Sequence, residues 1–97
     1  MELKRRLKKY VKFKYSHREE RVFGIIAKAP NSATGTATPQ IVAQLFSGED
    51  LPFHATTMTL SAIRSLIKKM QLNGEPVTVK RIKYKDQKSH YFWIDKL

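Results

Sequence analysis

The chain of 97 residues has three histidines, His17, His54 and His90, as its candidates for metal or proton chemistry. A zinc site needs three or four Cys, His or carboxylate ligands that the fold brings together. The histidines are scattered along a chain that has no cysteine. The nearest approach to a site is His17 with Glu20 on one helical turn, and this pair lacks a third ligand. We therefore expect no metal.

Motifs of catalysis are missing from the sequence as well. It contains no Ser/His/Asp ordering, phosphate-binding loop or dinucleotide fingerprint, and Gly35 stands alone in its loop. We therefore expect no cofactor and no enzymatic activity, and we look for the function in binding.

Positive charge is the most informative feature of the composition. The net charge is +11, and it is unevenly distributed. Residues 1–16 contain seven Lys and Arg, residues 64–90 contain eight, and residues 22–63 contain only Lys28. Like charges held close together repel in the folded state, so two basic blocks predict a polyanionic partner. Nucleic acid is the first candidate, and an anionic membrane surface or an acidic protein competes with it.

Length and composition predict one domain with one modest core. The chain lacks cysteine and has no apolar stretch long enough to span a bilayer. We expect a basic N-terminal segment over residues 1–16 and a domain over residues 17–97. The protein is expected to be cytoplasmic, associated with the nucleoid and not with a membrane.

The first predicted helix covers residues 17–29. Ser16 and Glu19 have the spacing of a capping box, in which each side chain accepts from the other's backbone N–H. Pro30 disfavours helical geometry at Ala29 and ends the helix there.

A loop of small residues follows, with a short edge strand expected around residues 34–36. Thr38, followed by proline, is expected to be the N-cap of a short helix over residues 39–46. The connection SGEDLPFHATT comes next, and we expect Leu51 and Phe53 to anchor it on the core.

The third predicted helix begins between Thr57 and Ser61 and ends at the turn-forming pair Asn73-Gly74. At about 100° per residue, its apolar side chains share one arc. The polar side chains of the opposite arc are Thr57, Ser61, Arg64, Ser65 and Lys68.

Alternation from residue 77 onward predicts a hairpin, with strands over 77–84 and 90–94 and a polar turn at 85–88. The aromatic and apolar residues of the second strand, Phe92, Trp93 and Ile94, are expected in the core. Residues 1–15 leave three readings open, a basic amphipathic helix, a strand or a flexible arm, and the helix is favoured.

The short helix TPQIVAQLF, the helix LSAIRSLIKKMQLNG running into EPVTVKRIKY, and the basic turn closed by HYFWI occur in a familiar order. Over about residues 21–95 this order resembles the winged helix-turn-helix DNA-binding domains of bacterial, phage and plasmid regulators. The connection between the second and third helices is longer than the tight turn typical of that family. The resemblance implies an α+β fold that is mainly helical, with a three-helix core, a C-terminal β-hairpin wing and a basic N-terminal helix or arm.

The resemblance also implies a small transcriptional regulator that inserts helix 57–72 into the major groove of double-stranded DNA and uses hairpin 77–94 as a basic wing. On the helix, Arg64 is expected to contact guanine and Lys68 and Lys69 to contact phosphate. The DNA-binding residues implied on the helix are Thr57, Ser61, Arg64, Ser65, Lys68 and Lys69. Those implied on the wing are Lys80, Arg81, Lys83, Lys85 and Lys88, and those on an N-terminal arm are Lys4, Arg5, Arg6, Lys8 and Lys9.

Two other functions fit the same charge pattern. Winged domains and basic tails also serve RNA, which phosphate contacts cannot distinguish from DNA, so an RNA-binding or ribosome-associated module is one alternative. A module that binds an acidic protein is the other. A homodimer through the N-terminal segment or the first helix is expected in the DNA-binding case, because two half-sites multiply affinity.

Overall fold

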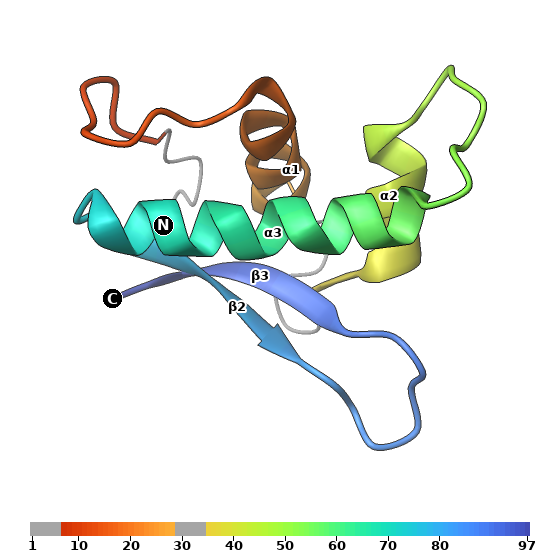
Figure 1. The fold of residues 1–97 in the computed structure, drawn as a ribbon. Coiled ribbons are helices and arrows are strands. Elements are labelled where there is room, and N and C mark those ends of the chain that lie inside the picture. Colours follow the sequence, from red (N-terminus) through yellow and green to blue (C-terminus); the bar gives the residue numbers. More distant parts are fainter. Residues whose placement is uncertain (1–6, 29–34) are drawn as a thin grey trace.

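The computed structural model describes residues 7–28 and 35–97, and within them the chain forms three helices and a three-stranded antiparallel sheet (Figure 1). The α+β class expected from the sequence is confirmed. The elements in chain order are α1 (His17–Ala27), β1 (Thr36–Ala37), α2 (Thr38–Leu45), α3 (Ala55–Leu72), β2 (Val77–Ile82) and β3 (Tyr91–Lys96).

The sheet has the order β1-β3-β2, so the short strand before α2 pairs with the last strand of the chain. Thr36 lies opposite Phe92, and Val79 lies opposite Ile94. The edge strand expected around residues 34–36 is therefore present at 36–37, and residue 34 lies outside the described residues. The helices cover one face of the sheet, on which Val79, Phe92 and Ile94 are buried.

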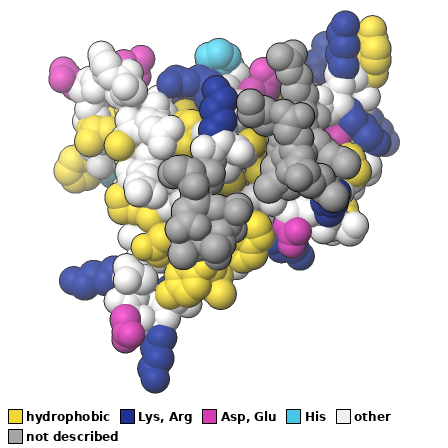
Figure 2. Space-filling model, turned by 180° about the vertical axis from the view of Figure 1, so that it is seen from behind, with side chains coloured by type: hydrophobic (Ala, Val, Ile, Leu, Met, Phe, Trp, Pro, Cys, Tyr) yellow, Lys and Arg dark blue, Asp and Glu magenta, His cyan; other side chains and the backbone are white. Residues whose placement is uncertain are grey.

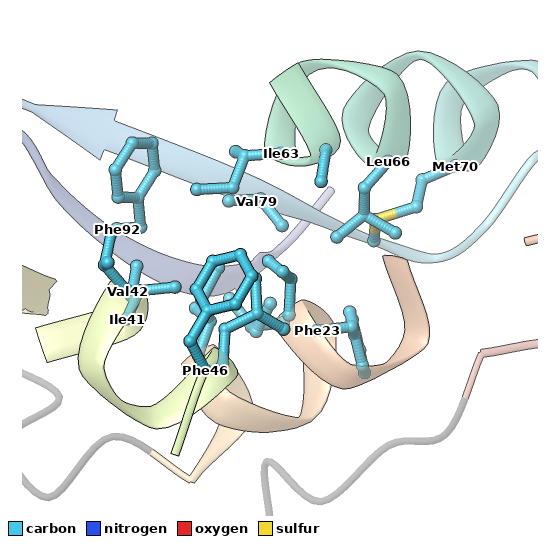
Figure 3. Close-up of a cluster of buried hydrophobic side chains, with 14 of the residues drawn as sticks. Phe23, Ile41, Val42, Phe46, Ile63, Leu66, Met70, Val79 and Phe92 are labelled. Atoms are coloured by element: carbon cyan, nitrogen blue, oxygen red, sulfur yellow. The ribbon is translucent and has the colours of Figure 1, made fainter. Parts of the chain in front are cut away.

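The core lies between this sheet face and all three helices (Figure 3). α1 contributes Phe23, α2 contributes Ile41, α3 contributes Leu66, and the sheet contributes Phe92, each at most 5% exposed. Full burial of such a side chain stabilises the fold by roughly 1.5–3 kcal/mol. These contacts hold α3 against the sheet and fix which of its faces remains outside.

The capping box at the start of α1 forms as predicted. The Ser16 Oγ accepts from the Glu19 N–H at 3.1 Å, and the Glu19 Oε1 accepts from the Ser16 N–H at 2.6 Å. The helix ends at Ala27, earlier than the predicted residue 29, because Lys28 already has the non-helical angles φ −90° and ψ 10°. Residues 29 and 30 lie outside the described residues.

Thr38 is not the N-cap of α2, contrary to the prediction. Ala37 occupies that position, and the Gln40 side chain accepts from its N–H at 3.2 Å. The Thr38 hydroxyl instead donates to the His90 carbonyl at 3.0 Å, since the pairing of β1 with β3 brings that carbonyl within reach. The hydroxyl therefore ties the start of α2 to the sheet.

The connection before α3 differs most from the expectation. α3 begins at Ala55, before the predicted window of Thr57 to Ser61, because Ala55 and Thr59 pack on the core side and the Thr59 hydroxyl donates to the Ala55 carbonyl at 2.8 Å. The prediction that Leu51 and Phe53 anchor the connection is wrong. These side chains are 62% and 95% exposed.

The predicted hairpin is present, but the ends of its strands differ from the prediction. β2 ends at Ile82, two residues before the predicted end, and β3 covers Tyr91–Lys96. Trp93 is half-buried and not part of the core, because it lies on the sheet face that points away from the helices. The loop between the strands projects from the body of the domain (Figure 1).

The N-terminal segment does not form the favoured helix where it is described, over residues 7–16. Its backbone groups bond to Lys69 of α3 and to Asn73 and Glu75 in the turn after it, so the i to i+4 bonds of a helix are replaced by distant partners. Residues 1–6 lie outside the described residues. None of the helices within residues 7–28 and 35–97 combines the length and the hydrophobicity of a membrane-spanning segment.

Gly35, directly before β1, lies very close to the backbone of β3, and replacing it tests this close approach. It has φ +82°, and a Cβ placed on it would lie 2.8 Å from the Phe92 carbonyl oxygen. Gly48 has a similar φ of +80° with open space around it, so it is a matched control.

We expect Gly48→Ala to lower the free energy of unfolding by about 1 kcal/mol. Gly35→Ala should cost about 1–3 kcal/mol more, because the strands must also separate. Urea denaturation measures both, and equal losses would contradict the close approach.

Candidate nucleic-acid interface

The outer face of α3 carries four of the predicted binding residues, Thr57, Ser61, Arg64 and Lys68, all of them exposed. The opposite side of the helix is buried in the core through residues that include Ile63 and Leu66. The helix therefore presents two small hydroxyl side chains and two cations to solvent along its length. In Figure 1 this helix crosses the front of the molecule.

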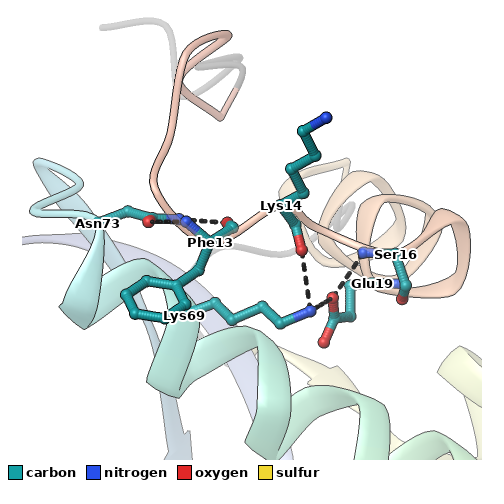
Figure 4. A network of polar contacts seen from close by, with 6 residues as sticks. All are labelled: Phe13, Lys14, Ser16, Glu19, Lys69 and Asn73. Atoms are coloured by element: carbon teal, nitrogen blue, oxygen red, sulfur yellow. Dashed lines mark hydrogen bonds and ion pairs between the residues drawn. The ribbon is translucent and has the colours of Figure 1, made fainter.

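Lys69, a predicted phosphate contact, points instead toward α1 (Figure 4). Its Nζ donates to the Glu19 Oε1 at 2.8 Å and to the Lys14 carbonyl at 2.9 Å. Ser65 lies beside Lys69 on the flank of α3 that faces α1, but it is exposed and lines the hollow next to Glu19. The Lys69 ammonium is engaged within the protein, so Lys69 is left out of the candidate interface. Ser65 stays at the edge of that interface.

The Glu19 carboxylate is the buried member of this network, with 4% of the residue exposed. Burial on its own would raise its pKa, since it removes water from the charged form. Hydrogen bonds from Lys69, Ser65 and the Ser16 N–H outweigh this effect, and the pKa of Glu19 is lowered from its ordinary value. The carboxylate is therefore ionised near neutral pH and holds α1 to α3.

A second buried carboxylate, Glu75, holds the N-terminal segment. Its two oxygens accept from the Lys8 backbone N–H at 3.2 and 3.0 Å, and one of them accepts from the Tyr15 hydroxyl at 2.6 Å. Burial raises the pKa of Tyr15 to about 12, with the Glu75 carboxylate adding to the rise and a hydrogen bond with Asn73 opposing it. The Asn73 amide also pairs with the Phe13 backbone N–H and carbonyl, each at 2.9 Å (Figure 4).

The hairpin cations do not all point the same way. Lys80 pairs with Trp93 on the outer face of the sheet, whereas Arg81 pairs with Phe92 on the face that carries the helices. The remaining cations, Lys83, Lys85 and Lys88, lie exposed in the loop that joins the strands. Figure 2 shows Lys and Arg side chains at the hairpin end, well separated from the cations on the other side of the molecule.

The N-terminal cations are only partly described. Lys8 is exposed, and its Nζ donates to the Gly74 carbonyl at 2.9 Å. Lys9 is exposed and lies over the Tyr10 ring at 5.7 Å. The other three predicted residues of this group, Lys4, Arg5 and Arg6, lie outside the described residues.

The sequence reasoning missed the basic start of α1. Arg18 and Arg21 line a hollow of about 570 Å³ that is also lined by Ser61 of α3 and by Phe46 after α2. The Arg18 guanidinium lies 5.9 Å from the centre of the Phe46 ring. These arginines therefore border the outer face of α3. The available signal was the spacing of the two arginines in HREER, which are three residues apart and so share one face of a helix.

Two further sources of evidence on the function are metal-binding groups among the described residues and similarity to known proteins. Among residues 7–28 and 35–97, no three His, Cys, Asp or Glu side chains are placed to hold an ion together. Comparison of the chain with models of protein families, with curated proteins and with solved structures found no match in any of the three.

The Glu19–Lys69 pair predicts a pH-dependent contribution to stability. Because the folded pKa of Glu19 is lowered, this contribution is present above the unfolded value of about 4.3 and is lost as pH falls through the folded pKa. We expect Lys69→Met to lower the free energy of unfolding by about 2 kcal/mol at pH 7, and by less in acid.

Urea denaturation of this variant near pH 7 and near pH 4 measures both effects. Lys68→Met removes an exposed neighbouring cation and is expected to change stability by less than about 0.5 kcal/mol. Equal losses for the two variants would contradict the structural role of Lys69.

Proposed function

We propose that this protein binds double-stranded DNA through the outer face of α3 and the basic end of the hairpin, and that it acts as a small transcriptional regulator. The observation that supports this most is the uncovered polar face of α3. Burial of one side of an 18-residue helix leaves Thr57, Ser61, Arg64 and Lys68 together in solvent. A helix with short side chains beside cations is suited to approach base edges and phosphates in a major groove.

The arrangement of elements is compatible with a winged helix, which gives each part a role in the proposal. In the proposal, α3 is the recognition helix and the β2–β3 hairpin is the wing, and the order of helices and strands, with β1 pairing to β3, supports these roles. Lys83, Lys85 and Lys88 at the hairpin end meet the DNA backbone or the neighbouring minor groove. Arg81 belongs to the same side of the sheet as α3, so it joins this surface.

Electrostatics supports a nucleic acid over a neutral partner. The net charge is +11, and Arg18 and Arg21 add cations next to α3. Phosphate contacts of this kind supply affinity without sequence information, whereas Arg64 supplies a fork of donors that matches the edge of guanine.

Arg64 is the residue whose replacement separates sequence recognition from charge. In a gel-shift assay with duplexes selected from a random pool, Arg64→Ala is expected to weaken binding to the selected sequence by about 1–3 kcal/mol. Arg64→Lys keeps the charge and loses the fork, so it should retain binding to unselected duplexes while losing the preference. If the wild-type protein selects no common sequence, the regulator proposal fails.

The hairpin lysines predict a change in salt dependence. The double variant Lys85→Ala/Lys88→Ala is expected to reduce the slope of log affinity against log salt by about 2, because each lost phosphate contact removes about 1. Lys28→Ala removes a charge at the end of α1 and should leave the slope unchanged.

Competition distinguishes the alternatives. Structured RNA that displaces the selected duplex at equal concentration would favour an RNA-binding module. No binding to either polymer at low salt would favour an acidic protein partner.

A further inference from the structure

The loop before α3 exposes apolar side chains that have no role in the proposed DNA interface. Phe53 is 95% exposed and Leu51 is 62% exposed, and they are preceded by the exposed acids Glu49 and Asp50. Removing such large apolar side chains from water, by burial against a partner, is energetically favourable. We name residues 49–53 the acidic–apolar loop.

A groove with the opposite charge and the same apolar character lies elsewhere on the domain. It has a volume of about 1070 Å³ and runs between the N-terminal segment and α1. Its apolar lining includes Leu7, Val11 and Phe23. Among the described residues, its charged lining is formed by four lysines and one acid, namely Lys8, Lys9, Lys14, Lys28 and Glu20. We name this the basic–apolar groove.

The loop and the groove cannot meet within one molecule. In Figure 1 the acidic–apolar loop lies at the upper right and the N-terminal segment at the upper left, with α1 between them. The groove is lined by Glu20 and Gly24 of α1 and by Lys28 directly after it, whereas Glu49 lies with Arg18 and Arg21 around the other hollow. The two surfaces therefore occupy different sides of α1.

We propose that the protein self-associates head to tail, with the acidic–apolar loop of one copy seated in the basic–apolar groove of the next. Leu51 and Phe53 fill the apolar part of the groove, and Glu49 and Asp50 lie near its lysine rim. Both halves of the contact are present in every copy at equal concentration, so no other component is required. The two surfaces differ, which makes the interface heterologous and allows an open chain of copies.

The contact is small, since one loop of five residues supplies one side of it. Interfaces of this size are weak in solution, so association is expected only at high protein concentration. Copies bound side by side on one DNA molecule would have a raised effective concentration, and the weak contact would then favour neighbouring occupancy.

Gly24 provides a way to block the groove without disturbing the fold. It lines the groove, and a Cβ placed on it meets no atom within 4 Å. Gly24→Gln therefore fills the groove with a side chain that a helix accepts, and Gly24→Ala is the matched control with only a Cβ. On the other surface, Phe53→Ser removes the exposed ring. Leu72→Ser is its control, because Leu72 is also exposed, at 53%, but lies at the end of α3.

Sedimentation equilibrium of the full chain without nucleic acid tests the proposal, so a negative result leaves the DNA-binding proposal untouched. The monomer mass is 11.3 kDa. For the wild type, Gly24→Ala and Leu72→Ser, we expect an average mass that rises beyond the dimer up to about 1 mM protein. Phe53→Ser and Gly24→Gln should each stay monomeric.

Mixing the two blocked variants gives the decisive result. Phe53→Ser retains an intact groove and Gly24→Gln retains an intact loop, so together they should form a 1:1 dimer that grows no further. A wild type that stays monomeric, or stops at the dimer, would overturn the proposal. A mixture that stays monomeric, or a blocked variant that associates like the wild type, would overturn it as well.

Discussion

Glu19 is a buried carboxylate at the junction of α1, α3 and the N-terminal segment, and its contacts hold these three parts together. Its Oε1 accepts from the Ser16 N–H and from the Lys69 ammonium, which also bonds to the Lys14 carbonyl. A buried charge without such partners would be strongly destabilising. The same side chain therefore caps one helix and holds the flank of another, and it adds to the core contacts that fix the face that α3 turns to solvent.

This constraint gives the two flanks of α3 different tasks. Lys69 is used to hold Glu19, whereas Lys68, only one residue away, remains outside. The contacts that anchor the helix therefore also decide which of its residues remain exposed for the proposed binding surface. The N-terminal segment is anchored in the same way by Glu75, and together with α1 it forms the walls of the basic–apolar groove.

Features that depend on neighbours in sequence were predictable. The capping box at Ser16 and Glu19 and the turn at Gly74, which has φ +66°, rest on contacts within a few residues. The N-terminal segment was not predictable, because the partners of Lys8 and Phe13 are 67 and 60 residues away. The helical periodicity of α3 could not predict that Lys69 contacts α1. Periodicity places Lys69 beside the polar arc, but it does not show where α1 lies. Leu51 and Phe53 were assigned to the core from residue type alone, and the early start of α3 leaves them outside.

The central claim is that the outer face of α3 and the hairpin end contact one nucleic-acid molecule together. Backbone amide chemical shifts of the full chain, recorded while a short duplex is added, test this most directly. We expect the largest changes in residues 57–68 and 81–88, and we expect them to saturate at the same duplex concentration. Changes confined to the groove lined by residues 7–15 and α1, or different saturation points for α3 and the hairpin, would contradict it.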